Sequence, residues 1–221
     1  MYKTNRIITT SDGSHTIYVP ELDEHYHSVH GAIQESEHVF MTNGFDYCLE
    51  DPVKILEIGF GTGLNTLLAA VRGFQDSRQI FYTAIEKYPL HDKIVKVLNY
   101  PEFTGENSKM IFEKIHSSEW GKDSKINKNF NLIKICCDLV KESIEGCFNL
   151  IFFDAFGPDK QPEMWTKDVF NKVSTVTTTK GILVTYSAKG EVKRNLESCG
   201  FNVSRLPGPP GKREMIRAIK S

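Results

Sequence analysis

The most informative part of this sequence is a glycine-rich stretch that follows a short apolar run. It reads Glu57-Ile58-Gly59-Phe60-Gly61-Thr62-Gly63-Leu64-Asn65. Residues 53–58 have the composition of a buried strand, and residues 64–71 have the spacing of a helix. Glycines between a strand and a helix allow positive φ angles and let a ligand approach the backbone. Because such turns also occur without a ligand, the neighbouring residues are needed to judge whether this turn binds one.

Strand-like and helix-like segments alternate along most of the chain. Strands are expected at residues 53–58, 80–86, 131–136, 147–153 and 181–186, and late strands at 201–203 and 215–219. Helices are expected at 64–71, 94–98, 162–176 and 192–199. This alternation predicts an α/β fold with a mostly parallel, doubly wound sheet. Residues 101–129 are polar and poorly periodic, so we expect an insertion there.

The chain before residue 52 has a different pattern. Two β-rich runs, residues 7–10 and 16–19, flank the turn residues Ser11-Asp12-Gly13-Ser14, which predicts a hairpin. A helix is expected from Ile33 to about Asn43-Gly44. We therefore expect residues 1–51 to be an N-terminal hairpin and helical extension, and residues 52–221 to be the main domain of one compact unit.

Composition excludes several classes of protein. Hydrophobic residues make up 40% of the 221 residues, which is too many for a disordered chain. Five Cys without CxxC spacing predict reduced thiols in a cytosolic protein rather than a disulfide framework. The polar start, residues 1–6, has no targeting signal, and no apolar run reaches the ~18 residues of a membrane span. A net charge of −1 means that nucleic-acid binding requires a local basic patch.

Four carboxylates are expected at one edge of the sheet. Glu57, Glu86 and Asp154 end predicted strands, and Asp138 lies just beyond another. Ligands of open α/β sheets bind outside the carboxyl ends of the strands. Several acids at this edge repel a pyrophosphate and favour a cationic ligand such as S-adenosylmethionine. Glu86, 23 residues after Gly63, has the spacing of an acid that binds ribose hydroxyls, which a nicotinamide dinucleotide would share.

The glycine spacing helps to choose between these two cofactors. The turn has GxGxG spacing, whereas dinucleotide-binding turns have GxGxxG. Together with Glu57 and Asp154, this spacing favours S-adenosylmethionine. An oxidoreductase with a nicotinamide cofactor remains the alternative.

Separate motifs along the chain resemble methyltransferases of the MnmC/MnmD type. They are Tyr26-His27-Ser28 with Gly31-Ala32 and Glu35-Ser36, the turn at 58–65, Phe153-Asp154-Ala155-Phe156-Gly157-Pro158 with Pro162-Glu163-Met164-Trp165, and Gly211-Lys212-Arg213-Glu214-Met215. The resemblance covers nearly the whole chain. It departs at Gly157 and Asp159, where Ala is usual, and at Pro209-Pro210, where a less rigid glycine-rich segment is usual.

The resemblance implies a Rossmann-like class I S-adenosylmethionine-dependent methyltransferase. Its members methylate the aminomethyl group of 5-aminomethyl-2-thiouridine at the tRNA wobble position. The implied partner is the tRNA anticodon loop, in the cytoplasm, after a separate enzyme has supplied the aminomethyl uridine. Some members carry a flavin oxidoreductase domain after the methyltransferase; a chain of 221 residues leaves no room for it, so FAD is not expected.

Site residues follow from the motifs and from the resemblance. Asp154 is expected to bind and aim the amine, with bulk water taking the proton, because an Asp of ordinary pKa ~3.9 is a weak base for an alkylammonium. The expected cofactor-binding residues are Glu57, Gly59, Phe60, Gly61, Thr62, Gly63, Asn65, Glu86, Asp138, Tyr26, Ser28 and Glu35. The expected substrate-binding residues are Phe156, Trp165, Lys160, Lys212 and Arg213.

Two of these substrate assignments have structural alternatives. Phe156 and Trp165 are candidates for an apolar wall against the uracil, although Trp165 is equally suited to core packing. Residues 187–221 hold eight Lys and Arg against three Glu, which suits a phosphate-binding face or a solvated charged face.

Other functions remain open from the sequence. His25, His27 and His30 do not have the spacing of a regular metal site, so no metal is expected. The alternatives are a methyltransferase for a small-molecule or protein amine, a NAD-dependent oxidoreductase, and a non-catalytic RNA-binding module.

Overall fold

Apolar residues at alternating positions of the central strands form two cores, one on each face of the sheet. In strand β8 (Phe148–Phe153), Leu150 and Phe152 belong to one core, and Ile151 and Phe153 belong to the other. Successive side chains of a strand point to opposite faces, so a strand that is apolar at every position has to be covered on both sides. The computed structural model describes residues 5–221; residues 1–4, part of the polar start of the chain where no targeting signal was expected, lie outside the described residues.

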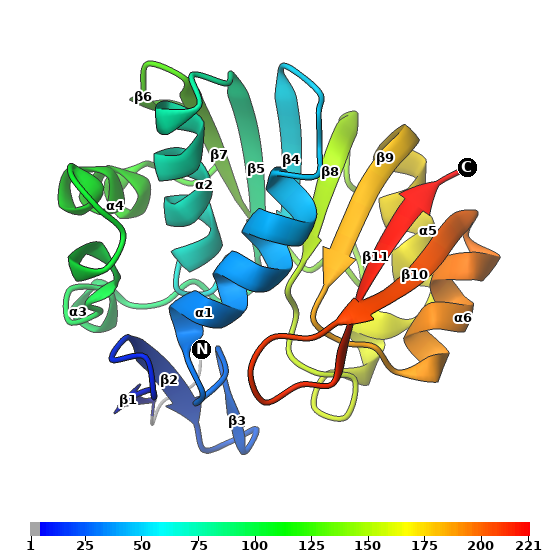
Figure 1. The fold of residues 1–221 in the computed structure, drawn as a ribbon, viewed down its shortest axis with the longest axis horizontal. Helices are drawn as coiled ribbons and strands as arrows, with labels where there is room; N and C mark the ends of the chain where they lie inside the picture. Colours follow the sequence, from blue (N-terminus) through cyan, green and yellow to red (C-terminus); the bar gives the residue numbers. More distant parts are fainter. Residues whose placement is uncertain (1–4) are drawn as a thin grey trace.

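The main sheet has eight strands in the order β10-β11-β9-β8-β4-β5-β7-β6 (Figure 1). Strands β9, β8, β4, β5 and β7 are parallel, whereas β6 and β11 run antiparallel to their neighbours. The predicted α/β fold with a mostly parallel sheet is therefore confirmed. The remaining strands are β4 (Val53–Ile58), β5 (Ile80–Glu86), β6 (Asp123–Asn127), β7 (Phe130–Cys136), β9 (Thr177–Thr185), β10 (Phe201–Pro207) and β11 (Glu214–Lys220).

The strand order places a crevice between β4 and β8. Strands that follow β4 directly, β5 and β7, lie on one side of it, and β8 and β9 lie on the other side. The chain connections that follow β4 and β8 therefore run toward opposite edges of the sheet. Ligands of open α/β sheets bind at such a topological switch point. The glycine turn after β4 and Asp154 after β8 both lie there.

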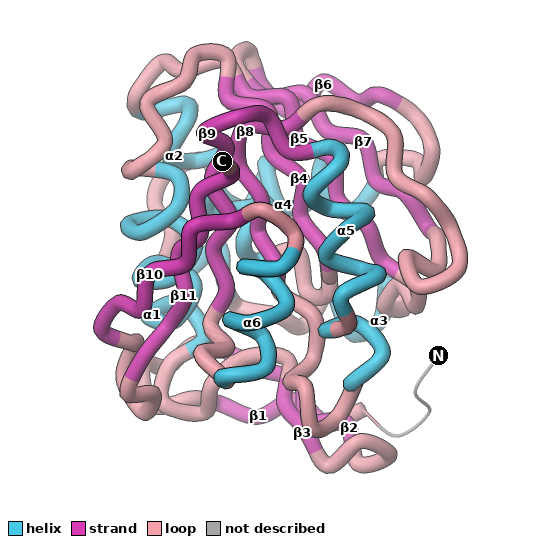
Figure 2. Tube along the Cα trace, turned by 90° about the vertical axis from the view of Figure 1, so that its right-hand side faces the viewer, coloured by secondary structure: helices cyan, strands magenta, loops and turns pink. Residues whose placement is uncertain are grey.

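Helices cover both faces of the sheet (Figures 1 and 2). One face carries α2 (Leu64–Gln75), α4 (Ser108–Ser117) and the α1 helix (Ala32–Ser36), which continues as a π-helix, η1 (Glu37–Phe45). The other face carries α5 (Lys167–Val176) and α6 (Gly190–Ser198). A short 3-10 helix, η3 (Pro162–Trp165), precedes α5. Among residues 5–221, no helix is long and apolar enough to cross a membrane.

The N-terminal segment forms a second, three-stranded antiparallel sheet. The predicted hairpin is present as β1 (Arg6–Thr9) and β2 (His15–Val19). A short third strand, β3 (Glu24–His25), was not expected; it pairs with β2 and leads into the His-rich segment. Figure 1 shows this sheet beneath the end of the main sheet, where α1 begins.

Residues 101–129 are not the insertion that the sequence predicted. They contain most of the 3-10 helix η2 (Tyr100–Glu102), helix α4 and the edge strand β6. Helix α4 buries Ile111, Phe112 and Ile115, whose helical spacing is hidden between polar residues, and it packs on α2. The prediction of a helix over 94–98 was also wrong beyond Val95, because α3 spans only Asp92–Val95.

Candidate active site

A cavity of about 420 Å³ opens at the carboxyl ends of the central strands. Its walls come from the glycine turn, from the ends of β5, β7, β8 and β9, from the segment after β3, and from the loop between β10 and β11. The structure brings together on these walls most of the residues expected from the sequence, namely Tyr26, Ser28, Glu35, Gly59, Phe60, Gly61, Thr62, Asn65, Glu86, Asp138, Asp154, Phe156 and Lys212.

The glycine turn passes very close to two other walls of the cavity. Gly59 has a φ of 91°, and a Cβ on it would lie 2.4 Å from the backbone oxygen of Asp154. Gly61 has a φ of 49°, and a Cβ there would lie 3.0 Å from Cδ1 of Tyr26. Only glycine fits both the conformation and the space at these two positions.

Glu86 holds the far side of this turn. One of its oxygens, Oε2, accepts a hydrogen bond of 3.0 Å from the Gly61 N–H, and Oε1 accepts one of 2.8 Å from the Tyr88 N–H. Burial raises the pKa of Glu86, although these backbone hydrogen bonds favour its charged form. A half-buried carboxylate at the end of β5 is suited to bind ligand hydroxyl groups.

Asp138 lies at the adjacent strand end, after β7. Its Oδ2 forms an ion pair of 3.0 Å with Nζ of Lys87. Burial acts to raise the pKa of Asp138, but the bond and the charge of Lys87 outweigh burial and lower it. Asp138 therefore stays ionised at neutral pH.

Asp154 follows β8, across the switch point from the glycine turn. Its Oδ2 accepts a hydrogen bond of 2.8 Å from Nδ2 of Asn65, the first-turn residue of α2. Burial raises the pKa of Asp154 to about 7, and the charge of Glu35 acts in the same direction. The hydrogen bond from Asn65 and the charge of Lys212 oppose this increase. Asp154 can therefore exchange a proton near neutral pH.

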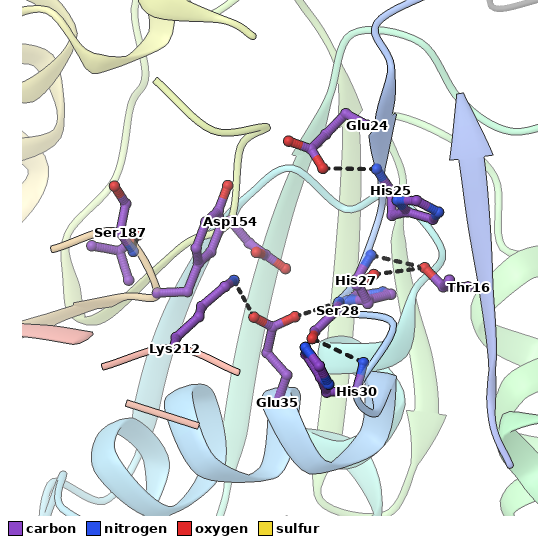
Figure 3. Close-up of polar contacts among 12 residues, drawn as sticks. Thr16, Glu24, His25, His27, Ser28, His30, Glu35, Asp154, Ser187 and Lys212 are labelled. Atoms are coloured by element: carbon purple, nitrogen blue, oxygen red, sulfur yellow. Dashed lines mark hydrogen bonds and ion pairs between the residues drawn. The ribbon is translucent and has the colours of Figure 1, made fainter. Parts of the chain in front are cut away.

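Glu35 and Lys212 meet inside the cavity (Figure 3). Glu35 is buried; its Oε2 accepts a hydrogen bond of 2.7 Å from the Ser28 N–H, and its Oε1 pairs with the Lys212 ammonium group. The same ammonium group lies 3.8 Å from the centre of the Tyr186 ring. Lys212 is therefore directed into the cavity, and its charge is already compensated by Glu35.

His27 supports the glycine turn from the N-terminal segment. Its Nε2 lies 2.8 Å from Oγ1 of Thr62, and its backbone N–H donates to Oγ1 of Thr16 at 2.9 Å. Burial lowers the pKa of His27 to about 4, so the ring is neutral at pH 7.

Glu57 does not lie where the sequence placed it. Its side chain is fully buried and absent from the cavity wall, and its Oε2 accepts a hydrogen bond of 2.7 Å from Oγ1 of Thr66 in α2. The reason is the alternation of β4, in which Ile55 and Glu57 share the face that α2 covers. Gly63, also expected at the cofactor, lies behind the wall, where it caps α2 and faces the His116 ring.

Trp165 and Lys160 also lie off the cavity wall. Trp165 is buried in the core against Phe153, with ring centres 4.9 Å apart, and its Nε1–H donates to the Phe156 oxygen at 2.7 Å. The geometry therefore matches core packing rather than a wall against the uracil. Lys160 makes an ion pair of 3.6 Å with Asp23.

Half of the eight cations in the basic C-terminal segment, Lys212 among them, form ion pairs with acids. Lys189 pairs with Asp159, Lys193 with Glu197 at 3.6 Å, and Arg205 with Glu214 at 3.4 Å. Within residues 5–221, the cations of this segment without an acidic ion-pair partner are Arg194, Arg213, Arg217 and Lys220. Lys220 donates to Ser174 and to the Cys199 oxygen, and Arg217 lies 3.5 Å from the Tyr47 ring centre. The expected phosphate-binding face is therefore reduced to a few side chains.

Several wall residues were missed in the sequence. Tyr186 follows β9, and its hydroxyl donates to the Ala155 oxygen at 2.8 Å. The rule that found Asp154 at a strand end would also have found Tyr186. Lys87 and Tyr88 also lie on the cavity wall, directly after Glu86 at the end of β5, so the same rule would have found them. Between residues 5 and 221, no group of three or more His, Cys, Asp or Glu is arranged to hold a metal ion.

The family of the chain follows from its sequence. A family model described as S-adenosyl-L-methionine-dependent methyltransferase matches residues 103–221. The chain belongs to this methyltransferase family. S-adenosylmethionine is accordingly its cofactor, and the cavity fits such a ligand: carboxylates from three strand ends and from Glu35 surround a turn that only glycine can form.

Curated relatives narrow the family to the MnmC type, and they confirm the resemblance seen in the motifs. The chain is 33% identical over 172 residues to the tRNA 5-methylaminomethyl-2-thiouridine biosynthesis bifunctional protein MnmC of Campylobacter hominis, covering 76% of this chain and 26% of that protein. It is 29% identical to the MnmC protein of Actinobacillus pleuropneumoniae, covering 89% of this chain and 32% of that protein. The chain thus spans about a quarter to a third of the length of these relatives.

A solved structure of an MnmC-type protein agrees with these relatives. The crystal structure of MNMC2 from Aquifex aeolicus superposes with a TM-score of 0.82 at 27% identity, covering 98% of this chain and 70% of that chain. Spermidine synthase from Thermotoga maritima has a TM-score of 0.60 at 12% identity, covering 99% of this chain and 70% of that chain, which shows a shared fold only.

Proposed function

We propose that this methyltransferase acts on tRNA, where it methylates the aminomethyl group of a wobble uridine such as 5-aminomethyl-2-thiouridine. The MnmC relatives, named for tRNA 5-methylaminomethyl-2-thiouridine biosynthesis, and the likeness to MNMC2 over 98% of the chain support this substrate. The single observation that carries the proposal is the position of Asp154, a carboxyl group with a pKa of about 7 on the wall of the cavity. A separate enzyme would supply the aminomethyl uridine.

Asp154 is the residue suited to prepare the amine. S-adenosylmethionine supplies a methyl group on a sulfonium, and an amine can displace it only in its neutral form. Asn65 occupies Oδ2 of Asp154, which leaves Oδ1 for the substrate ammonium group. A carboxylate with a pKa near the working pH is a much better proton acceptor than an ordinary Asp. We therefore assign proton removal to Asp154, in place of the bulk water expected from the sequence.

The aromatic residues at the cavity are suited to hold the uracil. The Phe156 ring lies on the wall and meets the Tyr26 ring edge-on, with centres 4.9 Å apart. Proteins recognise single-stranded loops by stacking unpaired bases on such rings. In this proposal Phe156 contacts the base, and Trp165 holds the Phe156 carbonyl from the core.

The proposal also assigns roles to the N-terminal extension and to Arg213. In this proposal residues 52–221 are the methyltransferase domain, and the described part of the extension that precedes it supplies Tyr26, Ser28 and Glu35 to the cavity. Arg213, next to Lys212 in the loop between β10 and β11, is the cation best placed to contact tRNA phosphates near the cavity.

The test is a methylation assay with nucleoside analysis. Labelled S-adenosylmethionine is incubated with tRNA that carries the aminomethyl uridine, and the digested tRNA is examined for the methylaminomethyl nucleoside. We expect this product with the wild-type chain and its loss with Asp154→Asn, which keeps the size of the side chain. No product, or equal methylation of the free nucleoside and of tRNA, would move the substrate to another amine. Stabilisation by NAD but not by S-adenosylhomocysteine would instead favour an oxidoreductase.

A further inference from the structure

Within the part of the chain that the structure describes, three buried polar atoms next to the active site have no hydrogen-bond partner. They are Oε1 of Glu57, Oδ1 of Asn65 and the hydroxyl of Tyr82. Asn65 and Tyr82 both act on the Glu57 carboxyl group, so the three side chains form one cluster beneath α2. The other oxygen of Glu57 already accepts from Thr66, and Nδ2 of Asn65 already donates to Asp154.

Counting donors and acceptors shows that this cluster is short of one proton. If Glu57 is ionised, Oε1 and Oδ1 of Asn65 are both acceptors, and the Tyr82 hydroxyl can donate to only one of them. The other acceptor would remain buried and unpaired, which is unfavourable. If Glu57 is protonated, its own O–H and the Tyr82 hydroxyl supply the two donors that the cluster requires.

The charges around Glu57 favour the same state. The side chains that act on its carboxyl group are Thr66, Asp154, Tyr82 and Asn65, and none of them is a cation. Burial raises the pKa of Glu57 to about 8, and the charge of Asp154 adds to this effect; the hydrogen bonds of Thr66, Tyr82 and Asn65 oppose it but are outweighed. A buried carboxyl group without a cationic partner is expected to stay neutral.

We propose that Glu57 is a positioning residue, which carries a proton at neutral pH and donates it to Oδ1 of Asn65. This bond keeps the Asn65 amide turned so that its NH2 group points at Asp154. Loss of the proton would make Glu57 a competing acceptor for the same NH2 group. Asp154 would then lose the hydrogen bond that orients it. The expected effect of Glu57 on activity rests on the proposed function of Asp154. The protonation of Glu57 does not depend on that proposal.

Infrared spectroscopy tests the proton directly, without any substrate. Asp154→Asn removes the neighbouring carboxyl group whose pKa is raised to about 7, so it is the background for the measurement. We expect a protonated-carboxyl band at pH 7 in Asp154→Asn that is absent from the double variant Asp154→Asn/Glu57→Gln. In Asp154→Asn the band should fade as the pH rises, starting below the wild-type pKa of about 8 because the charge of Asp154 no longer raises the pKa of Glu57. Identical spectra for the two variants would overturn the proposal. This result stands even if the chain methylates another substrate.

The activity arm compares two substitutions of Glu57. Gln can donate to Asn65 while it accepts from Thr66, so Glu57→Gln should stay within about threefold of the wild-type rate and lose the decline above pH 8. Glu57→Ala removes the donor and should fall by roughly tenfold or more. Thr66→Val, which removes only the bond to the other oxygen, is the matched control: it should keep the rate at pH 7 and move the decline to a higher pH, because the Thr66 bond lowers the pKa of Glu57. An equal loss in Glu57→Gln and Glu57→Ala would overturn the positioning role.

Discussion

Lys212 and Glu35 form an ion pair inside the cavity although they lie 177 residues apart in the sequence. The pair joins the loop between β10 and β11 to helix α1 at the wall of the cavity (Figure 3). Its two charges act on Asp154 in opposite directions, because Glu35 raises the pKa of Asp154 and Lys212 lowers it. The ion pair therefore helps to set the pH at which the proposed proton acceptor works.

Replacing Lys212 should move the acidic limb of the pH–rate profile. Lys212→Met removes the cation that lowers the pKa of Asp154, so that pKa rises above its present value of about 7. Because Asp154 has to be ionised to accept a proton, activity should begin at a higher pH and fall at pH 7. Arg213→Met is the control: it should weaken tRNA binding and its salt dependence but leave the acidic limb in place. An unshifted limb in Lys212→Met would exclude this electrostatic coupling.

The close approach of Gly59 to Asp154 gives a second prediction. Gly59→Ala should both strain the turn and push it from the Asp154 carbonyl, because the new Cβ would lie 2.4 Å from that oxygen. A non-glycine residue at such a φ costs about 1–3 kcal/mol before any clash. We expect a lower Tm and a large loss of affinity for S-adenosylhomocysteine, measured by calorimetry.

Gly105 is the matched control for this substitution. Its φ of 96° is close to that of Gly59, but no atom of residues 5–221 other than those of its chain neighbours lies within 4 Å of an added Cβ. Gly105→Ala should therefore lower the Tm slightly and leave the affinity unchanged. Equal effects of the two substitutions would mean that backbone strain, rather than the contact with Asp154, is responsible.

The sequence predicted the part of the site that depends on local pattern. An apolar run followed by a glycine turn located the β4–α2 unit, and the rule for strand ends located Glu86 and Asp154 at the cavity. The same rule failed for Glu57, because it says where a strand ends but not which face the last side chain occupies. The alternation of β4, with Ile55 two residues earlier on the same face, carried that information.

Other features depend on contacts between distant segments. The sequence gives no local signal that Lys212 turns inward to Glu35 rather than outward to phosphate. Likewise, the polar surface of α4 hides the three apolar residues that pack it on the core, so the region 101–129 did not look regular. Both errors arise because charge and polarity alone do not say which side of an element faces the protein.

Trp165 gives a prediction that separates substrate binding from cofactor binding. Trp165→Phe keeps an aromatic ring in the core but removes the Nε1–H that donates to the Phe156 oxygen at 2.7 Å. Loss of one such bond is worth about 1 kcal/mol and frees the segment that carries Phe156. The KM for tRNA should therefore rise about fivefold, while the Kd for S-adenosylhomocysteine stays the same. A change in cofactor affinity alone would contradict the proposed role of Phe156.

His27 should make the folded state sensitive to acid. Burial lowers its pKa from 6.5 to about 4, so the unfolded chain binds a proton more readily than the folded chain. The stability that His27 contributes is present above pH 6.5 and is lost as the pH falls toward 4, with a total on the order of 3 kcal/mol. His27→Gln, which can keep a hydrogen bond to Thr62, should reduce the decrease in Tm between pH 6.5 and 4.5. His91→Gln, at an exposed position, should follow the wild-type curve. If His27→Gln also follows it, the neutral ring of His27 does not contribute to the acid sensitivity.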